Sequence, residues 1–163
     1  MIIGEKPMRA VRGMAEEQAI FRLEGVTKTY GPVTALRDVS LSVGGNEYIS
    51  LLGPSGSGKS TLLRVIAGFE IPDRGRVYFN GRDISNVAAH QRGIGFVFQN
   101  FALFPHLTVS DNVAFGLANG NTPVPRAEIE KRVREVIALV GLAGLEGRGV
   151  HQISGGQKQR VAL

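Results

Sequence analysis

The sequence predicts an α/β domain, and three neighbouring features support this prediction. Residues 48–52 (Tyr-Ile-Ser-Leu-Leu) form an apolar run typical of a strand buried on both faces. In residues 61–68, apolar side chains recur at helical spacing up to Gly68, which is placed to end a helix. Between these two stretches lies the segment Gly53-Pro54-Ser55-Gly56-Ser57-Gly58-Lys59-Ser60. A glycine-rich loop that joins a strand to a helix is the arrangement of a phosphate-binding loop (P-loop).

This loop predicts that the chain binds a nucleoside triphosphate. Its glycines allow tight bends that turn successive N–H groups inward, and the helix N-terminus adds unpaired donors and a positive dipole end. Lys59 would reach the β- and γ-phosphates, and the Ser60 hydroxyl would bind Mg²⁺. The alternative is a Gly- and Ser-rich turn that happens to precede a lysine, which the flanking strand and helix disfavour.

Composition places the chain among globular proteins. Its 163 residues are 43% hydrophobic, enough for one well-cored domain. There are no cysteines, which fits a reducing cytoplasm, and no apolar run approaches the ~18 residues of a membrane span. Residues 1–19 are charged and predict a loose leader. The net charge of +5 admits nucleic acid, but the basic residues are scattered, so a solvated surface and no nucleic-acid partner are expected.

The flanks of the loop predict an antiparallel β layer. Apolar and polar residues alternate over residues 20–27 and again over residues 39–43, with a turn at Tyr30-Gly31-Pro32 between them. Asn80-Gly81 then separates residues 76–79 from residues 82–84, which is a strong hairpin signal. These segments are expected to lie beside the phosphate-binding core.

A second strand of the parallel core is predicted at residues 94–98, with Gln99 at its carboxyl end. Ligands of open parallel sheets bind at that edge. An unusually apolar connection, residues 101–107, follows Gln99, and Ser110-Asp111 then predicts the start of a helix that runs to about Leu117.

The remainder of the chain predicts two further helices. After a surface loop at residues 119–125, residues 126–140 form an amphipathic pattern ended by Gly141, with Glu128–Arg132 and Glu130–Arg134 as ion pairs. Residues 152–157 read Gln-Ile-Ser-Gly-Gly-Gln, in which Ser154 is a good N-cap and Gly155 and Gly156 expose the first N–H groups. A plain capped helix and a second phosphate contact are both open interpretations here.

Three of these motifs, in this order, resemble those of the ATP-binding cassette (ABC) transporter ATPases. Residues 53–60 match the Walker A motif, Gln99 the Q-loop, and Ser154-Gly155-Gly156-Gln157 the signature motif. The resemblance extends from residue 21 to residue 163, and residues 96–109 are similar to the importer branch that serves polyamines, ferric iron, sulfate or sugars. It implies a P-loop NTPase fold of ABC type: a RecA-like parallel core, an antiparallel β layer and an inserted helical subdomain.

The resemblance also implies roles for individual residues. Tyr30 would stack on adenine, although it is equally an ordinary residue at a strand end. Lys59, Ser60 and Thr61 would hold the phosphates and Mg²⁺. Gln99 would sense Mg²⁺ and the γ-phosphate. Residues 154–157 would contact ATP held by the opposite subunit of a head-to-tail dimer.

Two departures from the family pattern stand out. The usual leucine before the signature motif is Ile153, and the chain stops at Leu163, before the family's Walker B Asp, catalytic Glu and switch His. We therefore expect a C-terminally truncated domain that is inactive on its own. Its expected parts are a β layer and P-loop core (20–99), a helical subdomain (100–155) and the start of the signature helix (156–163).

The functional hypothesis is an ATPase subunit at the cytoplasmic face of the plasma membrane. It would hydrolyse ATP, with Mg²⁺, to drive uptake through a separate permease that docks near residues 101–107, and a solute-binding protein would take part indirectly. The alternatives are a non-transport ABC protein that acts on nucleic acid or ribosomes, and a nucleotide-binding fragment that does not hydrolyse.

Overall fold

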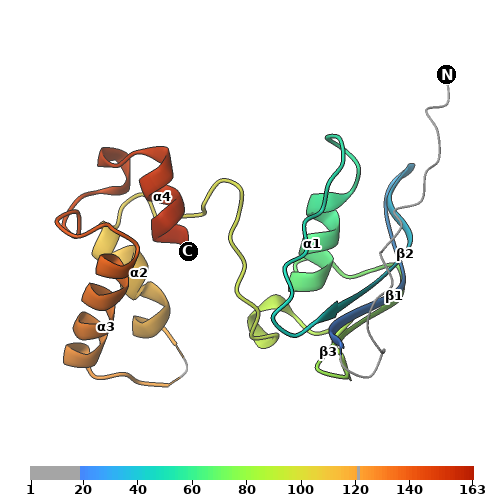
Figure 1. Ribbon diagram of the computed structural model, residues 1–163, viewed down its shortest axis with the longest axis horizontal. Coiled ribbons are helices and arrows are strands. Elements are labelled where there is room, and N and C mark those ends of the chain that lie inside the picture. Colours follow the sequence, from blue (N-terminus) through green and yellow to red (C-terminus); the bar gives the residue numbers. More distant parts are fainter. Residues whose placement is uncertain (1–18, 121) are drawn as a thin grey trace. The chain divides into compact units, whose positions relative to one another are not determined.

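The computed structural model describes residues 19–120 and 122–163, so most of the predicted leader lies outside the described residues. The chain divides after Gly95 into two compact units (Figure 1). The elements of the first unit are β1 (Ala19–Tyr30), β2 (Val33–Gly44), α1 (Lys59–Ala67), β3 (Arg74–Phe79), β4 (Arg82–Asp83) and the short 3-10 helix η2 (Ala89–Gln91). Those of the second are α2 (Val109–Ala118), α3 (Arg126–Leu139), the 3-10 helix η3 (Val150–Gln152) and α4 (Gly155–Ala162).

The first unit is built on a four-stranded antiparallel sheet with strand order β2-β1-β3-β4. The predicted β layer is thereby confirmed. Asn80 and Gly81, which join β3 to β4, both have positive φ (48° and 74°), as a two-residue hairpin turn requires. Helix α1 lies against this sheet, and its Leu62 and Val65 are fully buried with Leu23, Val26 and Val77 of the strands (Figure 1).

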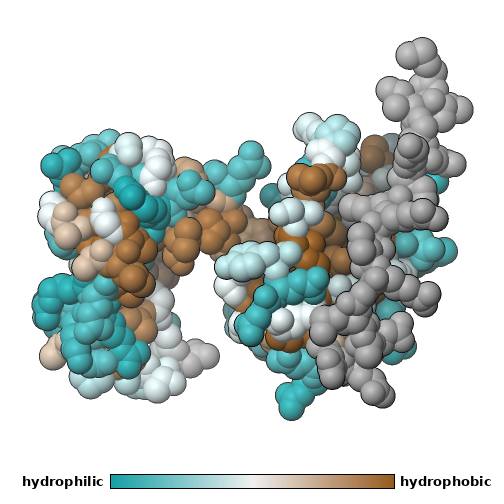
Figure 2. Space-filling view, in the orientation of Figure 1, coloured by the Kyte–Doolittle hydropathy of each residue, from teal (hydrophilic) through white to brown (hydrophobic). Residues whose placement is uncertain are grey.

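The second unit is a small helical bundle with its own core. Val109 of α2, Val133 and Ile137 of α3, and Val161 of α4 are buried together. Hydrophilic side chains gather over α3 in Figure 2, as its amphipathic pattern predicts. None of the helices in residues 19–120 and 122–163 has both the length and the apolar character that a membrane-spanning segment requires.

The two predicted strands of the parallel core are wrong for this structure. Residues 48–52 and residues 94–98 have no assigned secondary structure. Tyr48 and Leu52 are almost fully exposed, at 102% and 86%. An apolar run becomes a strand only when neighbouring strands satisfy its N–H and C=O groups. The only sheet in the described residues is the antiparallel one, and it pairs with neither segment.

Two predictions for the helical segment also need correction. The N-cap of α2 is Thr108, two residues before the predicted Ser110, because Thr108 and Asp111 form a reciprocal capping box. The Glu128–Arg132 pair is confirmed at 2.7 Å, but Glu130 pairs with Arg126 at 2.9 Å rather than with Arg134. Arg126 and Arg134 lie one helical turn from Glu130 in opposite directions, so sequence spacing alone does not decide between them.

Candidate functional site

The glycine-rich loop before α1 has the tight backbone that its sequence predicts. Gly58 is the N-cap residue of α1 and has a φ of 88°, in the left-handed region that favours glycine. A Cβ atom at this position would collide with the carbonyl oxygen of Ala35 in β2. Gly56 also has a positive φ, of 81°. Glycine at 58 is therefore required both by the bend of the loop and by its closeness to the sheet.

The ammonium group of Lys59 is directed back over this loop. Its Nζ atom donates to the carbonyl oxygens of Gly53 and Pro54, at 2.9 and 2.6 Å, and to the hydroxyl of Ser57, at 3.1 Å. Lys59 thus connects the start of the loop, at Gly53 and Pro54, to Ser57 near its end. It also places a positive charge inside the bend formed by residues 53–58.

The N-terminus of α1, like that of α3, has no side-chain cap, whereas α2 and α4 have one. Thr108 caps α2 and Ser154 caps α4, each with a side-chain oxygen bonded to a backbone N–H of the first turn. Gly58 provides no side chain, and α1 has no side-chain cap. The first N–H groups of a helix have no partner within the helix. At α1 no capping side chain bonds to them either, and the positive end of the helix dipole lies at the same point.

Tyr30, at the end of β1, is the predicted base-stacking residue, and the structure brings it to α1. Burial and the neighbouring Glu70 carboxylate raise the pKa of Tyr30, while the Lys28 ammonium and a hydrogen bond with the Thr61 hydroxyl act in the opposite direction. The Tyr30 ring remains 43% exposed. An aromatic surface is therefore available within reach of the helix that starts at Lys59.

Arg92, which no sequence pattern predicts, contacts the C-terminal end of α1. It is only 4% exposed, and its guanidinium donates to four main-chain carbonyl oxygens: Val65 and Ile66 of α1, and Ser85 and Val87 of the connection after β4. Burial lowers the pKa of this guanidinium. A lone arginine in a loop carries no sequence signal that would distinguish it from a surface arginine.

The remaining predicted site residues belong to the second unit. Gln99 is exposed and lies in a turn, residues 99–102, in which Phe101 and Ala102 have left-handed φ values of 65° and 48°. Such values are uncommon for residues with a Cβ atom. The backbone of this turn therefore departs from the local preference of its residues.

Asn112 of α2, which sequence analysis also missed, holds the segment after this turn. Its side-chain amide accepts from the Phe104 N–H at 2.8 Å and donates to the Phe104 and Thr108 carbonyls at 3.2 and 2.9 Å. The Phe104 ring lies 4.2 Å from that of Phe115, and both side chains are more than a third exposed. Phe115 of α2 and Phe104 of the preceding segment thus form an exposed aromatic pair, and the hydrogen bonds of Asn112 fix that segment to α2.

The predicted signature residues form the exposed start of α4. Ser154 accepts from the Gln157 N–H at 3.3 Å, and the Gln157 side chain accepts from the Ser154 N–H at 2.7 Å. Ser154, Gly155 and Gly156 are exposed, and Gln157 is half-buried. The predicted N-cap is thereby confirmed, whereas a phosphate contact here stays a prediction.

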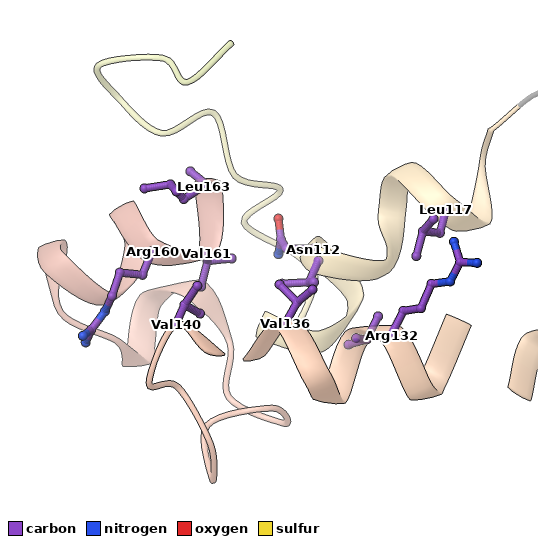
Figure 3. A pocket seen from close by; sticks show the side chains of 11 residues that line it. Asn112, Leu117, Arg132, Val136, Val140, Arg160, Val161 and Leu163 are labelled. Carbon is purple, nitrogen blue, oxygen red and sulfur yellow. The ribbon is translucent and has the colours of Figure 1, made fainter. Parts of the chain in front are cut away.

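A cavity of about 300 Å³ lies among α2, α3 and α4 (Figure 3). Val136, Val140, Val161 and Leu163 give it apolar walls, and Arg132 and Arg160 stand at its margins. None of the predicted site residues lines this cavity. Within residues 19–120 and 122–163 there is also no group of three or more His, Asp or Glu side chains suited to hold a metal ion.

The sequence matches one family over most of its length. The profile of the family described as ABC transporter matches residues 36–163. A sulfate/thiosulfate import ATP-binding protein, CysA 2 of Agrobacterium fabrum, is 51% identical over 142 residues, which are 87% of this chain and 42% of that protein. The corresponding CysA of Vibrio cholerae is 52% identical over 145 residues, covering 87% of this chain and 38% of that protein. The chain thus spans about two fifths of the length of these curated relatives.

Solved structures give the same result for the fold. A dimeric ATP-binding cassette in a post-hydrolysis state, bound to ADP and Pi, superposes with a TM-score of 0.79 at 36% identity, covering 87% of this chain and 66% of that one. CbiO1 from Clostridium perfringens, part of the transporter complex cbiONQ, superposes with a TM-score of 0.76 at 32% identity, covering 89% of this chain and 59% of that one.

Proposed function

Because the chain belongs to the ABC transporter family, we propose that it is the ATP-binding part of an importer and that it binds and hydrolyses ATP to drive solute uptake through a separate membrane permease. The observation that carries this proposal is the loop before α1. There, the left-handed Gly58, the uncapped helix start and the Lys59 ammonium directed over the loop support phosphate binding. The relatives named above are import proteins, which favours transport over a role on nucleic acid or ribosomes.

The loop, the start of α1 and Tyr30 bind different parts of the nucleotide in this proposal. The N–H groups of residues 56–61 and the dipole of α1 hold the phosphate oxygens. The ammonium of Lys59 turns from the carbonyls of Gly53 and Pro54 toward the β- and γ-phosphates, where its charge is better matched. Tyr30 offers its exposed ring to adenine. Thr61, which hydrogen-bonds to Tyr30, would contribute to phosphate binding from the first turn of α1.

Ser60 is the residue of the loop suited to hold Mg²⁺, because its exposed hydroxyl follows Lys59 at the start of α1. Gln99 belongs to the other compact unit, and its role toward Mg²⁺ stays a prediction from the sequence. When bound, Mg²⁺ neutralises charge on the β- and γ-phosphates. The protein residues bind the γ-phosphate and align it for in-line attack by water. Lys59 stabilises the negative charge of the γ-phosphate.

The start of α4 is the proposed contact with ATP on a second subunit. Ser154, Gly155 and Gly156 are exposed, and the positive dipole end of α4 lies at this point. Together with Gln157 they would bind the γ-phosphate of ATP held by the partner in a head-to-tail dimer. A dimeric cassette among the similar structures supports this arrangement.

A permease is the proposed partner of residues 101–107, at the cytoplasmic face of the membrane. The exposed Phe104 and Phe115 rings form a small aromatic surface that Asn112 holds in place. Cysteines at Ala102 and His106 should therefore cross-link to the permease. Cross-linking only to ribosomal proteins or nucleic acid would contradict this part of the proposal. The relatives' names make sulfate and thiosulfate the first solutes to test.

The central test is Lys59→Ala in the assembled transporter. The variant should lose ATP hydrolysis and ATP-driven uptake, because the charge that faces the phosphates is gone. Lys131→Ala is the matched control, since Lys131 is exposed on α3 and belongs to the other compact unit. A Lys59→Ala transporter with the wild-type ATPase rate would refute the assignment.

A further inference from the structure

Lys28 of β1 lies at the centre of a network that joins the end of this strand to the segment after α1. Its side chain is 15% exposed. Its Nζ atom donates to the Ile71 carbonyl oxygen at 2.8 Å and to Asp73 Oδ1 at 3.2 Å, and it lies 4.0 Å from Glu70 Oε2. The cation therefore has a fixed position, set by three groups of one short segment.

The backbone on either side of Lys28 is bound to the same segment. The Thr29 N–H donates to Asp73 Oδ2 at 2.6 Å, and the Asp73 N–H donates to the Thr27 carbonyl oxygen at 2.9 Å. Asp73 thus binds the strand through its main chain and its side chain. The last residues of β1 cannot shift without breaking these bonds.

The fixed cation stands over the ring of Tyr30. The distance from Lys28 Nζ to the centroid of the ring is 5.5 Å, within the range in which a cation is attracted to an aromatic face. Glu70, which neighbours the Tyr30 hydroxyl, is also the carboxylate 4.0 Å from Lys28. An exposed tyrosine at a strand end would otherwise be free to change rotamer.

We propose that Lys28 is a positioning residue for nucleobase recognition: it holds the Tyr30 ring in the orientation that stacks on the base of the bound nucleotide. This inference rests on the proposed function, because it takes Tyr30 as the surface that meets the base. It assigns Lys28 no contact with the phosphates, which the loop at residues 53–61 binds.

The test compares two ligands that share the phosphate chain but differ in the base. The affinities of the purified protein for ATP and for inorganic tripolyphosphate, both with Mg²⁺, are measured by calorimetry for the wild type and for Lys28→Met. The variant should bind ATP about five-fold more weakly, because the ring orientation that the cation–π contact holds in the wild type would then have to be fixed on binding. Its affinity for tripolyphosphate should not change. Lys28→Arg, which keeps a cation, should restore ATP binding, and Lys131→Met should alter neither affinity.

A double mutant shows whether Lys28 acts through Tyr30. In a Tyr30→Leu background, Lys28→Met should cause no further loss of ATP affinity. An equal loss for ATP and tripolyphosphate, or no loss for either, would overturn the inference while leaving the proposed function intact. A wild-type protein that binds neither ligand would instead refute the proposed function. If Lys28→Met does not fold, Lys28→Gln removes the cation but keeps a donor for the Ile71 carbonyl, and the same comparison decides.

Discussion

Replacing Arg92 with methionine should destabilise the protein by about 3–5 kcal/mol. Methionine fills much of the same space but leaves four main-chain carbonyls without their guanidinium donor: those of Val65, Ile66, Ser85 and Val87. A buried acceptor left without its partner costs about 1–3 kcal/mol. The Val65 oxygen keeps a second donor, the Gly68 N–H at 3.2 Å, so the full sum is not expected. The last turn of α1 also loses the cation that complements its dipole.

Urea denaturation followed by far-ultraviolet circular dichroism measures this loss, and it suits a chain without tryptophan. Arg134→Met is the matched control: Arg134 is exposed on α3, and arginine and methionine have similar helix propensities, so its effect should stay within about 0.5 kcal/mol. Arg92→Lys should fall between the two, because one ammonium cannot reach all four carbonyls. A loss below about 1 kcal/mol for Arg92→Met would show that water replaces the guanidinium, and would refute the reasoning.

Three further predictions concern the same unit. Leu62→Ala should cost about 2–5 kcal/mol in urea denaturation, because the side chain is fully buried, and a loss under 1 kcal/mol would mean that the core collapses around it. Gly58→Ala should weaken nucleotide binding in calorimetry at least as much as Lys59→Ala, since the added methyl group meets the Ala35 carbonyl; unchanged affinity would place the phosphates elsewhere. The Thr29 N–H and the Lys28 ammonium hold the pKa of Asp73 below its usual range. Its folded pKa is therefore lower than its unfolded pKa, so its stabilising effect is present above about pH 4 and is lost as the pH falls through the folded pKa. Asp73→Asn should therefore make the free energy of unfolding depend less on pH at the acid end of the curve. A curve identical to that of the wild type would contradict a lowered pKa for Asp73.

The sequence predicted those parts of the fold that local signals determine. Gly68 ends α1 in the left-handed conformation, Asn80-Gly81 forms the hairpin turn, and Ser154 caps α4. Each depends on residues close to one another in the chain. The apolar runs at residues 48–52 and 94–98 predicted strands, but strand formation depends on pairing partners that a pattern of hydrophobicity does not identify, and this is why the prediction failed there.

The candidate site shows the same division. The glycine positions and Lys59 follow from the motif, and the structure gives them the expected backbone. Arg92 and Lys28 were not predicted, because they donate to carbonyls far away in sequence, those of Val65 and Ile71. Asn112 binds carbonyls only four to eight residues away, but an asparagine within a helix carries no signal for such contacts. A side chain that supports a site in this way has no spacing rule, and only the folded structure reveals it.

The hydrogen bonds of Lys59 to its own loop mean that, under the proposed function, phosphate would replace bonds that already exist rather than order a free loop. The ammonium already ties Gly53, Pro54 and Ser57 into one shape, so the loop need not be ordered when a ligand arrives. The entropy of fixing the loop has been spent during folding, and the ligand only has to offer oxygens that the ammonium prefers to neutral carbonyls. Lys59 would thus hold the loop in one conformation before the ligand binds. Its three hydrogen bonds to the loop would then be replaced by bonds to the anion.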